Sequence, residues 1–498
     1  MSRLDTDILD VLIIGAGISG IGCACHLSRE LPEKTWAIVE ARDDLGGTWD
    51  LFKYPGIRSD SDLYTFSYDF KPWASPNSIA SASEIMDYLR ETADEYGVTD
   101  KIKYRHRVVS ANWDSDIGLW TLVVQGPSGL IHAKCRWVFS ATGYYDYEEA
   151  FRPEFPGESS FAGDLIHPQF WPENYEYAGK RVAIIGSGAT AITLLPEMAE
   201  TAEHVTQIQR TPSYVLARPK QDGLAKFLKA FLPAKTIHAI MRWKNTRVQR
   251  YFYLFCQRFP ERARRLIRKA NTKLLPDNYA VDTHFSPPYN PWDQRLCAAP
   301  DGDFFDAIRN GNATIETGEI DQLEANGVRM KSGELVLADT VIVATGLKLK
   351  MLGNIPLHVD GEIVDIPSSL VFRGMMLSDV PNFAFAIGYT NSSWTLKVDI
   401  LCRYLCDLIK AMDVERQSIC VPVAPGEVAQ TRPLLDFKAG YVLRALDELP
   451  KQGEGYPWEM TLNYMADRGS LKKRPVLDPA LTLRTPGRAK PTTEAEAA

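Results

Sequence analysis

The chain has 498 residues, of which 45% are hydrophobic and 24% are charged, and its formal net charge is −7. That length corresponds to two or three domains, and the hydrophobic fraction can build several large cores without disulfide or metal crosslinks. The negative net charge argues against a nucleic-acid-binding protein, since such proteins usually carry an excess of basic residues.

Neither a secretory signal nor a membrane-spanning helix is expected. Three charged residues precede the first apolar run, and no window approaches the roughly 18 consecutive apolar residues that a span needs. The eight cysteines show neither CxxC spacing nor a Cys/His cluster, so we expect reduced core thiols, no redox dithiol and no metal site. These features predict a cytoplasmic protein.

The first predicted strand, residues 10–14, runs into a glycine-rich loop that opens a helix over residues 19–31. The loop glycines are Gly15, Gly17 and Gly20, and a second predicted strand over residues 35–39 ends at Glu40. Glycines at this position let a pyrophosphate approach the helix N-terminus, and the acidic residue about 20 positions later accepts ribose hydroxyls. The pattern predicts a dinucleotide-binding unit.

The same order of elements starts again at a predicted strand over residues 181–185. The loop that follows is Gly186, Ser187, Gly188, Ala189, Thr190 and Ala191. After the next strand come Arg210 and Thr211, where the first unit has an acid, and an arginine there would pair with a 2′-phosphate. We therefore expect a flavoprotein that takes hydride from NADPH in preference to NADH.

Two strands run into the sequence Ala-Thr-Gly, at 141–143 and 344–346, and these are predicted crossing points between domains. The expected fold is α/β, with two Rossmann-like dinucleotide-binding domains and the NADP domain inserted in the FAD domain. The expected boundaries are 1–145 and 346–473 for the FAD domain, 146–345 for the NADP domain, and 474–498 for a disordered tail.

A helical insertion is predicted over about 222–278. Residues 224–273 hold 14 Lys or Arg and a single acidic residue, Glu261, together with aromatic residues such as Trp243 and Tyr251. Such a basic and aromatic segment is compatible with peripheral contact to an anionic membrane. The alternative is a helical subdomain whose basic side is solvated or lines the entry for an anionic cofactor.

Two motifs carry a resemblance to a known family. Phe161, Gly163, His167 and Trp171 have the spacing FxGxxxHxxxW, and a longer glycine–tryptophan–proline–aspartate string runs from residue 46 to Asp60. The chain therefore resembles the type I Baeyer–Villiger monooxygenases of the flavin-containing monooxygenase superfamily. Residues 289–296 and 387–394 are most similar to the ethionamide-activating group within that family.

The resemblance implies roles for individual residues. Contacts to FAD are implied for the first glycine loop with Ser19, for Glu40, Gly47, Thr48, Trp49 and Asp60, and for Val108 beside the adenine. Contacts to NADPH are implied for Arg58, Ser59, the second glycine loop, Arg210 and Thr211. Relatives often have a lysine just before the active-site arginine, whereas this chain has Gln294, which weakens the preference for NADPH.

The resemblance also implies the chemistry. Reduced flavin would react with O2 to give a C4a-peroxyflavin that attacks a ketone and yields an ester or lactone. Arg295 matches the family's active-site arginine, which keeps this peroxide anionic, and Asp60 matches the acid that tunes that arginine. His167 matches a residue that couples cofactor binding to domain movement. Bound NADP⁺ would shield the peroxide from water.

The expected substrate is a small hydrophobic ketone or a sulfide, with oxygen transfer to sulfides or thioamides as a second activity. One alternative is a flavin monooxygenase specialised for nitrogen or sulfur, although that group normally ends the fingerprint in Tyr or Phe where this chain has Trp171. The other is a non-catalytic flavoprotein redox sensor, which would have no use for Arg295.

Overall fold

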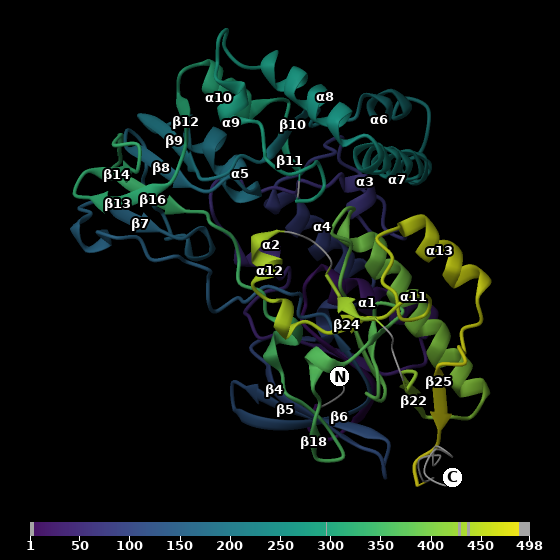
Figure 1. Ribbon diagram of the computed structural model, residues 1–498. Coiled ribbons are helices and arrows are strands. Elements are labelled where there is room, and N and C mark those ends of the chain that lie inside the picture. The colour runs from purple at the N-terminus through teal and green to yellow at the C-terminus, as the bar shows by residue number, and fades with distance from the viewer. Residues whose placement is uncertain (1–3, 295, 427–429, 436–438, 488–498) are drawn as a thin grey trace.

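The computed structural model describes residues 4–294, 296–426, 430–435 and 439–487. Two lobes are joined by a pair of linkers, and a group of helices lies beside them (Figure 1). The larger lobe is built around a mixed sheet and the smaller lobe around a parallel sheet. The predicted α/β class with two Rossmann-like domains is confirmed.

The larger lobe contains a mixed sheet with the order β18-β17-β4-β5-β6-β1-β2-β3, and β21 also pairs with β6. Its centre, β1, is entirely apolar after Asp10 and pairs in parallel with β2 and β6, which is the pattern of a strand covered on both faces. The strands are β1 (Ile8–Ile14), β2 (Trp36–Val39), β3 (Ile102–Lys103), β4 (Arg107–Asp114), β5 (Leu119–Gly126), β6 (Gly129–Ser140), β17 (Leu357–Val359), β18 (Glu362–Ile363) and β21 (Phe383–Phe385).

Helices α1 and α11 pack against each other in this lobe, and most of their side chains are buried. Helix α4 begins at a capping box, in which Ser81 and Glu84 each bond the other's backbone N–H. The helices are α1 (Ile18–Glu30), α2 (Thr48–Leu51), α3 (Leu63–Phe66), α4 (Ala82–Glu95), α11 (Trp394–Val414), α12 (Gly440–Leu443) and α13 (Tyr464–Lys473). Short paired strands complete the lobe: β19 (Val371–Phe372) with β20 (Met376–Leu377), and β23 (Arg432–Pro433) with β24 (Lys451–Gln452).

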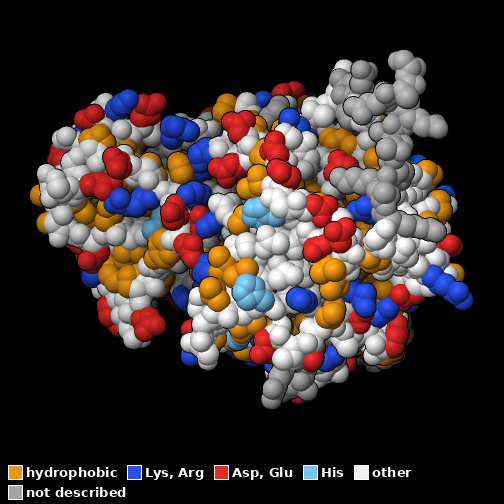
Figure 2. Space-filling view, turned by 90° about the horizontal axis from the view of Figure 1, so that it is seen from below, with side chains coloured by type: hydrophobic (Ala, Val, Ile, Leu, Met, Phe, Trp, Pro, Cys, Tyr) orange, Lys and Arg blue, Asp and Glu red, His pale blue; other side chains and the backbone are white. Residues whose placement is uncertain are grey.

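The smaller lobe has a five-stranded parallel sheet with the order β12-β9-β8-β16-β7. These strands are β7 (Asp164–Ile166), β8 (Arg181–Ile185), β9 (His204–Gln209), β12 (Ala313–Thr317) and β16 (Thr340–Val343). Around them lie α5 (Ala189–Met198), α9 (Val281–His284), α10 (Asp303–Arg309), and a sheet of β13 (Ile320–Glu324), β14 (Gly327–Met330) and β15 (Leu335–Leu337). Figure 2, which views the molecule from below, shows this lobe standing apart from the larger body.

Between β9 and β12 the chain leaves the sheet and forms the helical insertion. Strands β10 (Tyr214–Arg218) and β11 (Leu296–Pro300) pair in parallel at its base. The segment between them contains α6 (Gly223–Leu228), α7 (Ala234–Arg258) and α8 (Pro260–Thr272), which lie at the upper right of Figure 1. Helix α7 packs against α6, α8 and α3, and so connects the insertion to the larger lobe.

Two linkers run side by side between the lobes. Lys350 donates its backbone N–H to the carbonyl of Tyr144 at 3.0 Å, and Asp146 donates to the carbonyl of Lys348 at 2.9 Å. Because each linker follows one of the Ala-Thr-Gly sequences, the two crossing points lie together in space.

The prediction of a disordered tail from residue 474 is wrong for residues 474–487. Strand β25 (Leu481–Arg484) pairs with β22 (Ile419–Pro422), and Asp478 forms an ion pair with the buried Arg373. Apolar side chains between Val476 and Leu483 pack on the main core, so burial outweighs the polar composition that suggested disorder. Residues 488–498 lie outside the described residues.

Candidate active site

The first glycine loop lies between β1 and α1 as its spacing requires. Gly15 has a φ of +100°, and a Cβ there would lie 2.8 Å from the carbonyl oxygen of Ala141. A Cβ on Gly20 would lie 1.9 Å from the carbonyl of Gly15, so neither position accepts another residue without movement of the backbone. Gly17 is the N-cap of helix α1 and has no side chain to cap it, which leaves the first N–H groups of the helix available for an anion.

Glu40 closes the first loop from the end of β2. Its buried carboxylate accepts the N–H of Ala16 at 2.7 Å and the N–H of Arg42 at 2.8 Å. A carboxylate has about four acceptor positions, so two remain for the hydroxyls of a ribose. Val108 belongs to the same hydrophobic cluster as Ile14 and Val39, beside the ends of β1 and β2.

The segment around Gly47 covers the loop from the other side. Gly17 and Gly46 form an isolated β-bridge, and a Cβ on Gly47 would lie 3.1 Å from the Cα of Gly17. Thr48 shares a 3.3 Å hydrogen bond with the hydroxyl of Tyr147, and Trp49 packs edge-on against Phe66. The two glycine segments therefore pack backbone against backbone, with no side chain between them.

Trp394 contacts the first glycine loop, and nothing in the sequence indicated this contact. Its indole N–H donates to the hydroxyl of Ser19 at 2.9 Å, and its ring stacks on Tyr144 with the centroids 5.1 Å apart. A Cβ on Gly388 would lie 2.4 Å from the Trp394 ring, so the glycine is needed for this packing. Residues 387–394 stand out in the sequence only by their resemblance to the family. No spacing rule relates Trp394 to Ser19, which is 375 positions away.

The second glycine loop repeats the geometry of the first in the smaller lobe. Gly186 has a φ of +142°, and a Cβ there would lie 2.3 Å from the carbonyl of Ala344, just as Gly15 approaches Ala141. Ser187 donates to the carbonyl of Thr211 at 2.8 Å and accepts from Ser213 at 3.1 Å. A Cβ on Gly188 would meet no atom within 4 Å, so the entrance to α5 has open space where a phosphate would bind.

The remaining residues expected to contact NADPH differ in whether their side chains are free to do so. Arg210 is exposed at the end of β9, next to the loop, as a 2′-phosphate contact requires. Arg58 instead forms a 2.5 Å ion pair with Asp303 at the start of α10. Ser59 is buried, and its hydroxyl donates to the carbonyl of Ser61 at 3.0 Å, so this side chain is already used within its own turn.

A cavity of about 310 Å³ lies where the larger lobe, the smaller lobe and the insertion meet. Its polar wall includes Asp60, Ser61, Arg218, Gln249 and residues 389–393, and its apolar wall includes Leu216, Phe252 and Trp292. Five separate stretches of the chain therefore contribute to one cavity, in which Asp60 is the titratable group expected from the sequence.

Arg295 lies outside the described residues, so its side chain is not placed. Its neighbours in sequence bracket the cavity, because both Trp292 and Leu296 line it. Gln294 forms an isolated bridge with Pro291, which closes the turn just before Arg295.

His167 lies in the linker region and not in the cavity. Its Nδ1 accepts the backbone N–H of Gln169 at 3.1 Å, and burial lowers the ring pKa below its ordinary value. Gln169 in turn donates to the carbonyl of Asp146 at 2.8 Å. A neutral imidazole attached to the linker fits a coupling role better than proton transfer.

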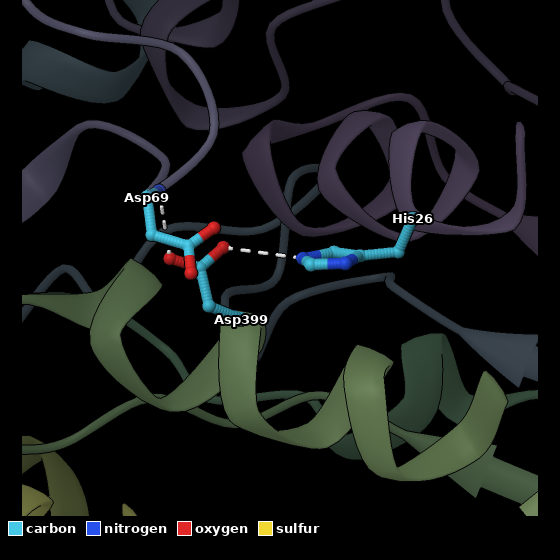
Figure 3. Close-up of side chains that lie close together, drawn as sticks. All are labelled: His26, Asp69 and Asp399. Carbon is cyan, nitrogen blue, oxygen red and sulfur yellow. Dashed lines mark hydrogen bonds and ion pairs between the residues drawn. The ribbon is translucent and has the colours of Figure 1, made fainter. Parts of the chain in front are cut away.

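A buried ionic cluster joins α1 and α11 of the larger lobe to α7 of the insertion. Figure 3 shows three of its members, His26, Asp69 and Asp399. Asp399 of α11 accepts from His26 of α1 at 3.5 Å and from Arg242 of α7 at 2.8 Å, and the backbone N–H of Asp69 donates to it as well. Burial alone would lower the His26 pKa, but hydrogen bonds to Asp399 and Glu30 raise it to about 10. His26, Asp69 and Asp399 could in principle ligate a metal, but a protonated imidazole and a guanidinium already occupy the positions of a cation.

The profile of the family described as flavin-binding monooxygenase-like matches residues 9–253. The FAD-containing monooxygenase EthA of Mycobacterium tuberculosis is 44% identical over 477 residues, which cover 96% of this chain and 98% of EthA. The probable FAD-binding monooxygenase AlmA of Acinetobacter baylyi is 45% identical over 470 residues, covering 93% and 94% of the two chains.

A solved structure of an oxidised steroid monooxygenase bound to NADP has the same fold. It superposes with a TM-score of 0.74 over 96% of this chain and 100% of its own, at 20% identity. The resemblance to a flavin monooxygenase family is thereby confirmed, whereas the roles of the individual site residues stay predictions. On the identity with EthA and AlmA over nearly its whole length, this chain belongs to the flavin-binding monooxygenase family.

Proposed function

We propose that the protein is a Baeyer–Villiger monooxygenase that uses FAD and NADPH to convert ketones into esters or lactones. The observation that carries the proposal is the cavity, which joins Asp60, the residues on both sides of Arg295, and segments from both lobes. An oxygen-transfer site in this family must expose a ketone to both cofactors at once, and a cavity between the lobes allows this.

FAD would bind at the first glycine loop, with Glu40 on its ribose and the Gly47 segment over it. NADPH would bind at the second loop, with its pyrophosphate at the N-terminus of α5 and its 2′-phosphate on Arg210. When bound, the flavin accepts hydride from NADPH and transfers one oxygen atom from O2 to the substrate.

Arg295 and Asp60 act on the charges that develop in the cavity. A guanidinium stays protonated at any working pH and presents a rigid set of donors, so Arg295 would stabilise negative charge on the ketone oxygen as oxygen is inserted. Asp60 would orient that guanidinium and limit its effective charge. The apolar wall with Phe252 and Trp292 would exclude water.

The substrate class follows from that apolar wall. A hydrophobic ketone would be preferred, and a sulfide or thioamide of similar shape would be oxidised at sulfur in the same cavity. Oxidation of nitrogen or sulfur alone is the alternative activity, and it would not require Arg295.

The proposal is tested by product analysis with NADPH, O2 and a linear methyl ketone, using the wild type and Arg295→Ala. We expect an acetate ester from the wild type and a rate about 10²–10³-fold lower in the variant, the usual loss when a donor to a developing oxyanion is removed. Gln294→Ala is the matched control and should keep the ester product. If the wild type consumes NADPH and releases hydrogen peroxide alone, the Baeyer–Villiger assignment is wrong.

A further inference from the structure

The helical insertion differs in charge from the rest of the molecule. Its residues 224–273 carry 14 of the 56 basic residues and one of the 63 acidic residues, so the remaining chain has 42 basic and 62 acidic residues. Figure 2 shows the end of the molecule opposite the insertion, where Asp and Glu side chains alternate with Lys and Arg. The insertion is therefore the positive end of a negative protein.

Most of these cations are not neutralised by carboxylates within the protein. Four of the 14 form ion pairs, namely Arg242, Lys244, Arg264 and Arg268. The other ten have no carboxylate partner among the described residues, and helix α8 has Arg265 and Lys269 exposed. Unpaired positive charge at this density is open to an external anionic surface.

Large apolar side chains are exposed among these cations. Phe227 of α6 and Phe231 in the turn after α6 are 64% and 70% exposed and pack against each other. Trp243 and Tyr251 of α7 are 59% and 69% exposed. Exposed aromatic side chains in this number on adjacent helices exceed the scattered apolar residues of an ordinary surface.

Cations and rings are paired on this surface. Arg247 lies over the ring of Trp243 at 4.2 Å, and Arg262 lies over the ring of Phe259 at 5.1 Å. Aromatic rings with an adjacent guanidinium suit the boundary between lipid headgroups and acyl chains, where the ring enters the apolar layer and the cation stays with the phosphates.

We propose that α6, α7 and α8 form a docking surface for anionic phospholipid membranes. The exposed rings would insert to the depth of the headgroups while the unpaired Lys and Arg bind lipid phosphates. None of the described helices has the length and apolar character of a membrane span, so the helices would lie on the bilayer. The negative remainder of the protein would be repelled by the same lipids, which fixes the orientation.

The docking surface adjoins the cavity. Helix α7 contributes Val248 and Phe252 to the cavity wall, and Val248 is also 58% exposed. An apolar substrate dissolved in the bilayer would enter at this helix without passing through water. This delivery role rests on the proposed function, whereas membrane binding does not.

Co-sedimentation with vesicles of phosphatidylcholine and phosphatidylglycerol tests the proposal with the full-length, FAD-loaded protein. We expect the wild type to bind these vesicles, to stay in solution with phosphatidylcholine alone, and to lose binding as salt is raised. Phe227→Ser/Phe231→Ser and Arg265→Glu/Lys269→Glu should each reduce the bound fraction about tenfold, since both kinds of contact are needed.

The matched controls are Ile363→Ser, which removes an equally exposed apolar side chain, and Lys134→Glu/Lys472→Glu, which reverses two exposed charges elsewhere that have no ion-pair partner among the described residues. Both should bind like the wild type, and every variant should oxidise a water-soluble ketone at the wild-type rate. Failure of the wild type to bind anionic vesicles would overturn the proposal. So would an unchanged bound fraction in the Phe227→Ser/Phe231→Ser variant, or a change in its oligomeric state in place of its vesicle binding.

Discussion

At the scale of single residues, the two predicted dinucleotide sites differ in the side chain that would recognise the nucleotide. Glu40 is buried and held by two backbone N–H groups, whereas Arg210 is exposed at the corresponding strand end. A buried acid is ordered before the ribose arrives. An exposed arginine is always charged, but a bound phosphate would be needed to hold its side chain in one position.

Arg210→Ala should therefore raise KM for NADPH about 10- to 100-fold and leave kcat nearly unchanged. The reason is that a charge-assisted contact to phosphate is worth about 1.5–3 kcal/mol and does not involve the reacting atoms. Steady-state kinetics with both nucleotides would check this. NADH, which lacks the 2′-phosphate, serves as the internal control, and an equal loss with NADH would contradict the assignment.

Residues in local motifs were predictable from the sequence, and residues in distant contacts were not. Gly15, Gly20 and Gly186 follow from strand–turn–helix geometry within about 30 residues of chain. The contact of Trp394 with Ser19 and the pairing of Arg58 with Asp303 join positions hundreds of residues apart, and no spacing rule relates them.

At the scale of elements, the cluster around Asp399 ties α1, α7 and α11 together. The side chains of His26, Arg242 and Asp399 are all buried, and the carboxylate of Asp399 compensates the positive charges of the other two within the core. The insertion is thereby fixed at the point where its helix also forms the cavity wall, so the cluster helps to hold the shape of the cavity.

His26 should make the stability of the protein depend on pH in the alkaline range. Its folded pKa of about 10 lies above the ordinary value of 6.5. Its contribution is thus fully present below pH 6.5 and is lost as the pH rises toward 10. The free energy of unfolding should fall over this interval in the wild type and fall less in His26→Gln.

Denaturant unfolding at several pH values would measure this difference. His132→Gln, which changes an exposed histidine on β6, should follow the wild type. Parallel pH profiles for His26→Gln and the wild type would show that the imidazole is neutral in the folded protein.

At the scale of the whole molecule, the paired linkers and the contact between Gly56 and α5 set the relation of the two lobes. A Cβ on Gly56 would lie 3.0 Å from the Cβ of Glu197, so the lobes approach closely there. Asp146 holds the linkers by accepting two backbone N–H groups and by an ion pair with Lys350 at 3.5 Å. Burial raises the pKa of Asp146, but these bonds outweigh it and hold the pKa below its ordinary value.

Asp146→Ala should loosen the linkers and increase the share of NADPH oxidation that ends in hydrogen peroxide several-fold. Lobes that do not close correctly would admit water to the cavity between them. The ratio of peroxide to ester would be measured at saturating substrate. Glu154→Ala is the control, because it removes an exposed carboxylate between β6 and β7 that has no ion-pair partner among the described residues. An unchanged ratio in Asp146→Ala would contradict the role of Asp146 in holding the linkers.

The sequence by itself determined the two nucleotide loops, the α/β class and the family, because these depend on steric rules and motifs that act over short stretches. It also located the basic segment 224–273, because the number of Lys and Arg in a stretch can be counted without knowing the fold. Tertiary structure alone decided the cavity, which five separate stretches of the chain assemble, and the anchoring of α7 through Asp399. It also decided that residues 481–484 form a strand, because the partner at 419–422 lies about 60 residues earlier and supplies the hydrogen bonds and burial.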